Sequence, residues 1–127
     1  MNSVRLNIAF AKGNYKAAYS LAEKLSDANK DNAMMQNQLA WQILTDPKIK
    51  ERDVKLAEKF ALRANEATVG KDAAILDTLA RAYFMNGNKD QAIATQEKAI
   101  KLAEGDMKEQ LQATLQSYRN GKLPAGE

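Results

Sequence analysis

The chain of 127 residues contains neither cysteine nor histidine. Without a thiol or an imidazole, the sequence excludes disulfides, a cysteine nucleophile, a histidine base and a zinc site built from Cys and His. The carboxylates that remain, such as Asp72, Asp77, Asp90 and Glu97, are explained by helix caps and solvated helix faces. The sequence also lacks the Gly-centred run of alternating acids that is typical of a calcium loop. We therefore predict no catalytic residues, no metal site, no cofactor and no enzyme activity for this chain.

Long apolar runs are absent as well, which predicts no membrane-spanning segment. No basic start followed by an apolar stretch occurs, so this chain carries no signal-peptide pattern, and its cellular location stays open. The net charge is only +3, and basic residues are mixed with acidic ones, as in the stretch 48–53. Nucleic-acid binding proteins usually gather their basic residues on one face. We therefore predict a soluble domain that binds neither membranes nor nucleic acids.

Proline is scarce, with two residues, and the six glycines lie between periodic segments rather than within them. Apolar residues recur at spacings of three and four, which predicts an all-α chain. Asn or Asp following a glycine, as in Gly13-Asn14 and Gly87-Asn88, predicts that one helix ends and the next is capped there. The predicted helices span residues 2–12, 15–28, 32–44, 53–67, 73–86, 89–103 and 106–119.

Small residues recur at a spacing of roughly thirty-five residues, which indicates stacked helix pairs. Three columns carry this signal: Leu6, Ala40 and Ala80; Ala18, Ala57 and Ala92; Leu25, Ala64 and Ala99. Residues 73–104 resemble the tetratricopeptide repeat closely. The family's large apolar positions are Leu76 and Leu79, its aromatic position is Tyr83 and its turn glycine is Gly87, whereas Gln96 and Glu104 depart from the pattern.

The resemblance implies a right-handed superhelix of three helix pairs in one domain, residues 1–120. The copies cover about 1–30, 32–68 and 73–104, and the second copy has a longer loop around 45–53. Residues 106–119 form an amphipathic segment that is predicted to cap the last pair, and 121–127 form a frayed tail. Met1 corresponds to the third position of the first copy, so we expect the beginning of that copy to be missing.

In tetratricopeptide arrays the first helix of each pair lines a concave groove that binds a peptide or a partner helix. Carried over to this sequence, the groove residues are Asn7, Phe10, Met34, Asn37, Trp41, Asp77, Arg81 and Phe84. The asparagine amides would bond a peptide backbone, the aromatic rings would anchor apolar side chains, and Arg81 would pair with a carboxylate. The resemblance thus implies a protein-interaction scaffold.

Each groove residue also has a purely structural interpretation. Trp41 would pack under the long loop on Pro47 or Ile49, and Phe84 would fill the seam between neighbouring copies. Arg81 would pair with Asp77, four residues away on the same helix. The asparagines would be ordinary surface residues.

Two alternative functions remain open at the level of sequence. The segments 40–47, 76–83 and 96–99 also resemble the repeat tails at the C-terminus of some bacterial thioredoxin-like (redoxin) proteins, which would make this chain the non-catalytic part of a larger enzyme. In that role it would act as a spacer or as a self-association module. Homo-oligomerisation would use the apolar edge of the first copy, formed by Val4, Ile8 and Ala11.

Overall fold

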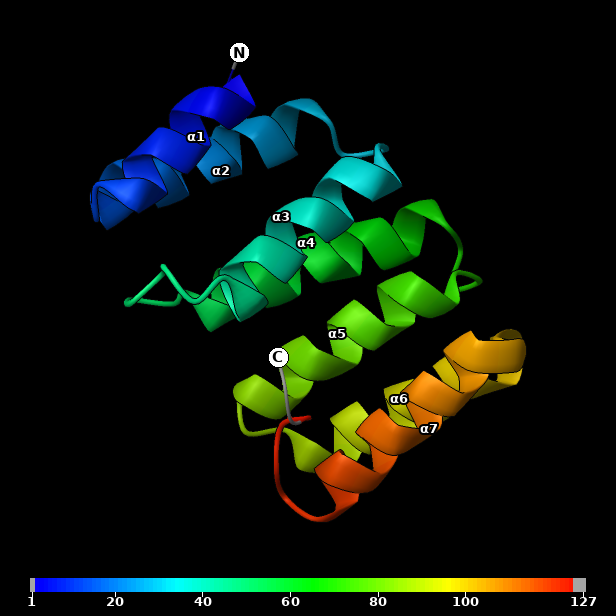
Figure 1. Ribbon diagram of the computed structural model, residues 1–127. Helices are drawn as coiled ribbons and strands as arrows, with labels where there is room; N and C mark the ends of the chain where they lie inside the picture. Colours follow the sequence, from blue (N-terminus) through cyan, green and yellow to red (C-terminus); the bar gives the residue numbers. More distant parts are fainter. Residues whose placement is uncertain (1, 125–127) are drawn as a thin grey trace.

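The computed structural model describes residues 2–124, and this part of the chain is built from helices joined by turns (Figure 1). The helices are α1 (Asn2–Ala11), α2 (Tyr15–Ala28), α3 (Ala33–Thr45), α4 (Val54–Ala67), α5 (Ala73–Met85), α6 (Lys89–Leu102) and α7 (Gly105–Arg119). Each boundary lies within one residue of the predicted one. The all-α class is confirmed, while the right-handed superhelix stays a prediction.

Consecutive helices pack as antiparallel pairs, α1 with α2, α3 with α4, and α5 with α6. In Figure 1, helices α1, α3, α5 and α7 form one layer, and α2, α4 and α6 form the layer behind it. The pairs are stacked in chain order, and the main contacts among the described helices join neighbours along the stack. A surface that runs across several pairs is therefore available on either layer.

Capping side chains fix the start of the helices that follow longer connections. Asp53 accepts a hydrogen bond from the backbone N–H of Leu56 at 3.0 Å, and Asp72 accepts one from that of Ala74 at 2.9 Å. Asn14 and Asn88 occupy the N-cap positions of α2 and α6 as expected, but their side chains make no capping hydrogen bond. At these tight turns the preceding glycine, with its positive φ angle, determines the chain reversal.

The small-residue columns form the centre of the stack. Seven alanines at these positions are fully buried: Ala18, Ala40, Ala57, Ala64, Ala80, Ala92 and Ala99. Their small size lets neighbouring helices approach closely, and larger residues such as Phe60 and Ile43 fill the remaining core. The core runs without a break from α1 to α5.

The long loop between α3 and α4 is held by specific contacts. Ile49 is buried in the core, and the Tyr15 hydroxyl accepts a hydrogen bond from Lys50 N at 2.8 Å. Tyr19 donates its hydroxyl hydrogen to the carbonyl of Glu51. Arg52 donates to the Ile43 carbonyl at 2.7 Å, which satisfies an acceptor that the end of α3 leaves free. The five extra residues of the second copy therefore form an ordered loop.

Helix α7 covers the exposed side of α6 through Leu111, Leu115 and Tyr118, which are all buried. Met107 belongs to the same sequence stripe, but it lies at the start of the helix and is exposed. Beyond α7, residues 121–124 are not helical. The rest of the predicted tail, residues 125–127, lies outside the described residues.

Candidate functional site

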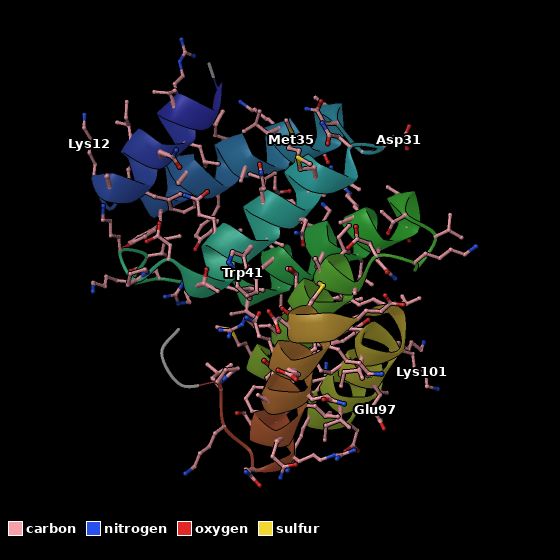
Figure 2. All side chains as sticks on the ribbon, turned by 45° about the vertical axis from the view of Figure 1, so that its right-hand side comes forward. Lys12, Asp31, Met35, Trp41, Glu97 and Lys101 are labelled. Carbon is pink, nitrogen blue, oxygen red and sulfur yellow. The ribbon has the colours of Figure 1, made fainter. Side chains whose placement is uncertain are left out.

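A hollow of about 430 Å³ lies between α1 and α3. Its lining residues are Leu6, Asn7, Leu25, Met35, Gln38, Leu39 and Gln42. They come from three helices, since Leu25 belongs to the last turns of α2. Figure 2 labels Met35 near the start of α3 and Trp41 further along the same helix. Apolar side chains thus form the walls, and three side-chain amides supply the polar groups.

Two leucines of the first copy account for the position of this hollow. Leu6 stands where the other copies have Ala40 and Ala80, and Leu25 stands where they have Ala64 and Ala99. The four alanines are fully buried, Leu6 is buried at 2% exposure and Leu25 is half-buried, and both leucines line the hollow. A leucine at a helix crossing prevents the close approach that an alanine permits. Accordingly, the backbones of α2 and α3 approach each other over a shorter stretch than those of α4 and α5.

A hydrogen bond between two amides crosses the space between α1 and α3. Gln42 Nε2 donates to Asn7 Oδ1 at 2.9 Å. On its far side lies a second hollow of about 380 Å³, lined by Val4, Asn7, Ile8, Phe10, Ala11, Gln42, Asp46 and Lys48. Because Asn7 and Gln42 line both spaces, the two hollows form one groove that this bond divides. We call it the α1–α3 groove.

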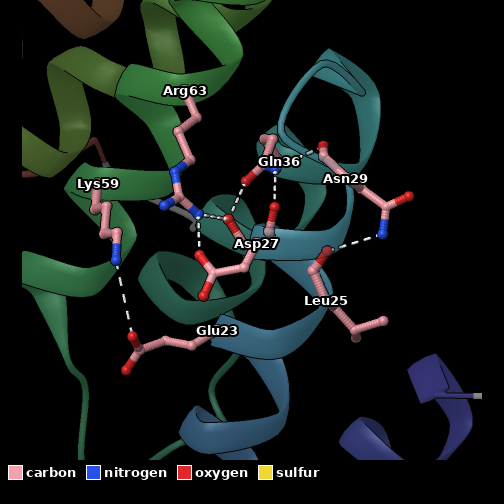
Figure 3. A network of polar contacts seen from close by, with 8 residues as sticks. Glu23, Leu25, Asp27, Asn29, Gln36, Lys59 and Arg63 are labelled. Atoms are coloured by element: carbon pink, nitrogen blue, oxygen red, sulfur yellow. Dashed lines mark hydrogen bonds and ion pairs between the residues drawn. The ribbon is translucent and has the colours of Figure 1, made fainter.

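A polar network joins α2 to the second pair beside the groove (Figure 3). Gln36 is fully buried on α3, and its amide donates to the carbonyls of Ser26 at 2.9 Å and Asn29 at 2.8 Å. These carbonyls lie at the end of α2, where the helix has no internal donors for them. Arg63 on α4 donates to the Ser26 hydroxyl at 2.6 Å. The first copy is thus attached to the second partly by hydrogen bonds.

The same network perturbs one carboxylate. Arg63 pairs with Asp27 at 2.9 Å, and this hydrogen bond holds the pKa of Asp27 below its usual value. A second pair, Glu23 with Lys59 at 3.7 Å, lies nearer the start of α2 and is exposed. Both pairs join α2 to α4, so each of these four charged side chains has its partner on the other helix.

The structure corrects two of the predicted groove residues. Phe10 is only 3% exposed, and its ring packs edge to face against Tyr19 with 5.3 Å between centroids. It forms part of a wall rather than a free anchor. Arg81 is 4% exposed, and its guanidinium lies over the Trp41 ring, 5.2 Å from the centroid. A cation buried in this way cannot meet a ligand carboxylate without leaving its place. Periodicity in the sequence could not show how deep each side chain lies.

Three other predicted residues already have neighbours within the chain. Trp41 is half-buried beneath Arg81, which brings its ring into contact with α5, and the packing on Pro47 or Ile49 stays a prediction. Phe84 stacks on Tyr118 of α7 with 4.6 Å between centroids, so this contact fills the seam between the third copy and the capping helix and not one between neighbouring copies. Asp77 accepts a hydrogen bond from Gln96 at 3.0 Å. Of these contacts, the one between Trp41 and Arg81 lies between α3 and α5, and the other two join α5 to α7 and to α6.

The remaining predicted residues are Asn7, Met34 and Asn37. Asn7 is exposed and lies at the centre of the α1–α3 groove. Met34 is 71% exposed and does not line the groove, whereas Met35, its neighbour in sequence, does. The Oδ1 atom of Asn37 is buried and has no hydrogen-bond partner among the described residues. Only Asn7 of the eight predicted residues therefore combines exposure with a place in the groove.

Sequence reasoning missed Leu25, Met35, Gln38 and Gln42. On α3 the tetratricopeptide pattern selects Met34, Asn37 and Trp41, whereas Met35, Gln38 and Gln42 line the hollow toward α1, and Leu25 reaches it from α2. A signal was present in the sequence. The first copy is the only one that breaks two small-residue columns, with Leu6 and Leu25.

A wider and shallower hollow of about 700 Å³ lies where α2 and α4 begin and α5 ends. Its lining mixes both signs of charge, with Lys16, Glu51 and Lys55 among the residues. Tyr19, in its wall, already bonds the loop backbone, and burial raises the pKa of its hydroxyl. Tyr15, Val54 and Met85 give this hollow apolar walls as well, so it differs from the hollow between α1 and α3 in its charged lining.

The apolar edge predicted for self-association is exposed, with Val4 and Ile8 about half-accessible on α1. Oligomerisation itself stays a prediction. Across residues 2–124, no group of three or more acidic residues converges as metal ligands would. In the same part of the chain, none of the helices has the length and apolar character needed to span a membrane.

Comparison of the chain with protein-family models, with curated proteins and with solved structures finds no match. The geometry of the chain itself therefore carries the functional argument.

Proposed function

We propose that this chain is a protein-interaction module of the helical-repeat type, which binds a peptide or a segment of a partner protein in the α1–α3 groove. The observation that carries the proposal is the hollow at the first copy, where Leu6 and Leu25 replace the buried alanines of the other copies. Apolar walls with a few polar groups are the usual composition of a binding site. The resemblance to tetratricopeptide repeats, whose groove binds peptides, adds to this argument.

The proposal narrows the binding surface from the predicted groove along α1, α3 and α5 to the space between α1 and α3. Between α3 and α5, the Trp41 ring is covered by Arg81, so a ligand would have to displace a cation–π contact. The α1–α3 groove is already open, and binding there needs only the exchange of one exposed hydrogen bond. The proposal assigns no catalytic step to the chain.

A selection followed by mapping tests this function. Peptides of about twelve residues are selected from a random display library on the wild-type chain, and the best one is titrated into isotopically labelled protein. We expect its largest amide shift changes at Leu25, Gln38 and Gln42. Shifts concentrated at Trp41 and Arg81 would return the site to the predicted region, and failure to select any peptide would refute the interaction function.

A further inference from the structure

The α1–α3 groove has features that restrict the chemistry of its occupant. We infer, on the basis of the proposed function, that it takes an extended, uncharged segment of a partner protein whose backbone replaces the Asn7–Gln42 hydrogen bond. The groove is divided by that bond into the two hollows of about 430 and 380 Å³. A ligand that occupies both hollows has to pass through the position of the bond.

The first argument is the absence of charge in the inner hollow. Its seven lining residues are apolar or carry amides, although 28% of the chain is charged. The only charged lining residues of the outer hollow are Asp46 and Lys48, one of each sign, at the end of α3. An ionised side chain that entered the inner hollow would lose water without gaining a counter-charge. The walls therefore complement an uncharged segment.

The second argument is the pairing of donor and acceptor at the bridge. The Gln42 amide donates and the Asn7 amide accepts. A peptide backbone offers one carbonyl and one N–H per residue, so it can satisfy both amides when it replaces their mutual bond. A helical ligand would have used most of these backbone groups internally. An extended strand leaves them free, as in other cases of strand recognition.

The third argument is length. From Met35 to Asp46, α3 extends for about 16 Å, given a rise of about 1.5 Å per residue. An extended chain advances about 3.3 Å per residue, so about five residues span both hollows. An apolar side chain of this segment would enter the space between Leu25 and Met35.

The experiment uses capped, fluorescein-labelled heptapeptide pools as the probe. One pool contains only uncharged residues; matched pools carry Asp or Lys at the central position, or an N-methylated central peptide bond. We expect the charged and N-methylated pools to bind the wild-type chain about tenfold more weakly or worse in fluorescence anisotropy, because each leaves a buried polar or charged group unpaired. Equal binding of all pools would overturn the inference.

A pair of variants locates the effect. Gln42→Glu places a negative charge at the position of the Asn7–Gln42 hydrogen bond. We therefore expect it to bind the uncharged pool more weakly than the wild type does, and the Lys pool more tightly. Gln110→Glu adds the same charge on the exposed face of α7 and serves as the control, with no change expected. Unchanged binding in Gln42→Glu would overturn the inference.

The failures of the two proposals are distinguishable. If the random library yields ligands but no heptapeptide pool binds, the inference of an extended segment is wrong and the interaction function stands. If neither the library nor the pools bind, the proposed function itself fails, and the inference fails with it.

Discussion

Two junctions of the stack carry hollows of similar size but of different chemistry. At the first junction, where α1 and the end of α2 meet α3, a hollow of about 430 Å³ is lined by apolar and amide side chains. At the second, between α6 and α7, a hollow of about 420 Å³ has Glu97, Lys101 and Arg119 in its lining. The interior of the second junction is closed, because Ala99 is buried together with Leu76 and Leu111. What distinguishes the first hollow is therefore its uncharged lining and not its volume.

The two junctions are held partly in the same way. At the first, the buried Gln36 amide donates to the Ser26 carbonyl, and at the second, the buried Gln96 amide donates to the Leu111 carbonyl at 3.2 Å. Each also has an ion pair, Asp27 with Arg63 and Glu97 with Arg119. Helix α7 has in addition the stacked rings of Phe84 and Tyr118. Because apolar burial contributes more net free energy than polar attachments do, we expect the second junction to be the more stable one, and the proposed binding surface lies at the first.

We expect the largest loss of stability when a buried side chain is truncated at the second junction, where α7 covers the third copy. Tyr118 is fully buried against Ala80 and Ala92, so Tyr118→Ala leaves a cavity beneath α7. We expect the free energy of unfolding to fall by about 3–5 kcal/mol, as for other large aromatic truncations. Urea denaturation measures this change. Arg119→Ala, at an exposed neighbour, is the control with an expected loss of less than about 1 kcal/mol. Similar losses in both variants would contradict the account.

A smaller loss of stability should follow when Ala99 of the third copy is replaced by leucine, the residue that the first copy has at this position. Ala99→Leu overpacks the junction between α6 and α7, and we expect it to lower the free energy of unfolding by about 1–3 kcal/mol. Ala94→Leu introduces the same residue on the exposed face of α6 and should change stability little. If Ala99→Leu has the same free energy of unfolding as the wild type, the size of the residue in this small-residue column does not determine the helix spacing.

The smallest expected loss of stability concerns the ion pair between Asp27 and Arg63, which joins α2 to α4. Because Arg63 lowers the pKa of Asp27 in the folded chain, ionised Asp27 stabilises the fold above its unfolded pKa of about 4. This contribution is lost as the pH falls and the carboxylate is protonated. We expect Asp27→Asn to lower the melting temperature slightly at pH 7 and to reduce its decline toward pH 3. Asp31→Asn serves as the control. An equal decline of the melting temperature in the wild type and in Asp27→Asn would show that the Asp27–Arg63 pair contributes nothing to stability.

The sequence predicted the helices to within one residue, because glycine turns, capping residues and periodic apolar positions are local signals. The alanines of the small-residue columns are buried, but so are Ala22, Ala61, Ala82 and Ala103, which belong to none of the columns. The candidate site depends on the depth of side chains and on helix spacing, which are not local signals. Arg81 and Trp41, for example, contact each other, and this contact uses a surface that a ligand would need. Gln42 acquires its role only through Asn7, 35 residues away in the sequence.

The most direct test compares two adjacent methionines. Met35 lines the α1–α3 groove, and Met34 is exposed outside it, so the same substitution at both positions separates groove binding from surface charge. With a library-selected peptide, and with folding checked by circular dichroism, we expect Met35→Glu to weaken binding about tenfold or more, because a carboxylate in an apolar wall is unpaired. Met34→Glu should bind like the wild type. Equal weakening in both variants, or an effect of Met34→Glu alone, would contradict the account.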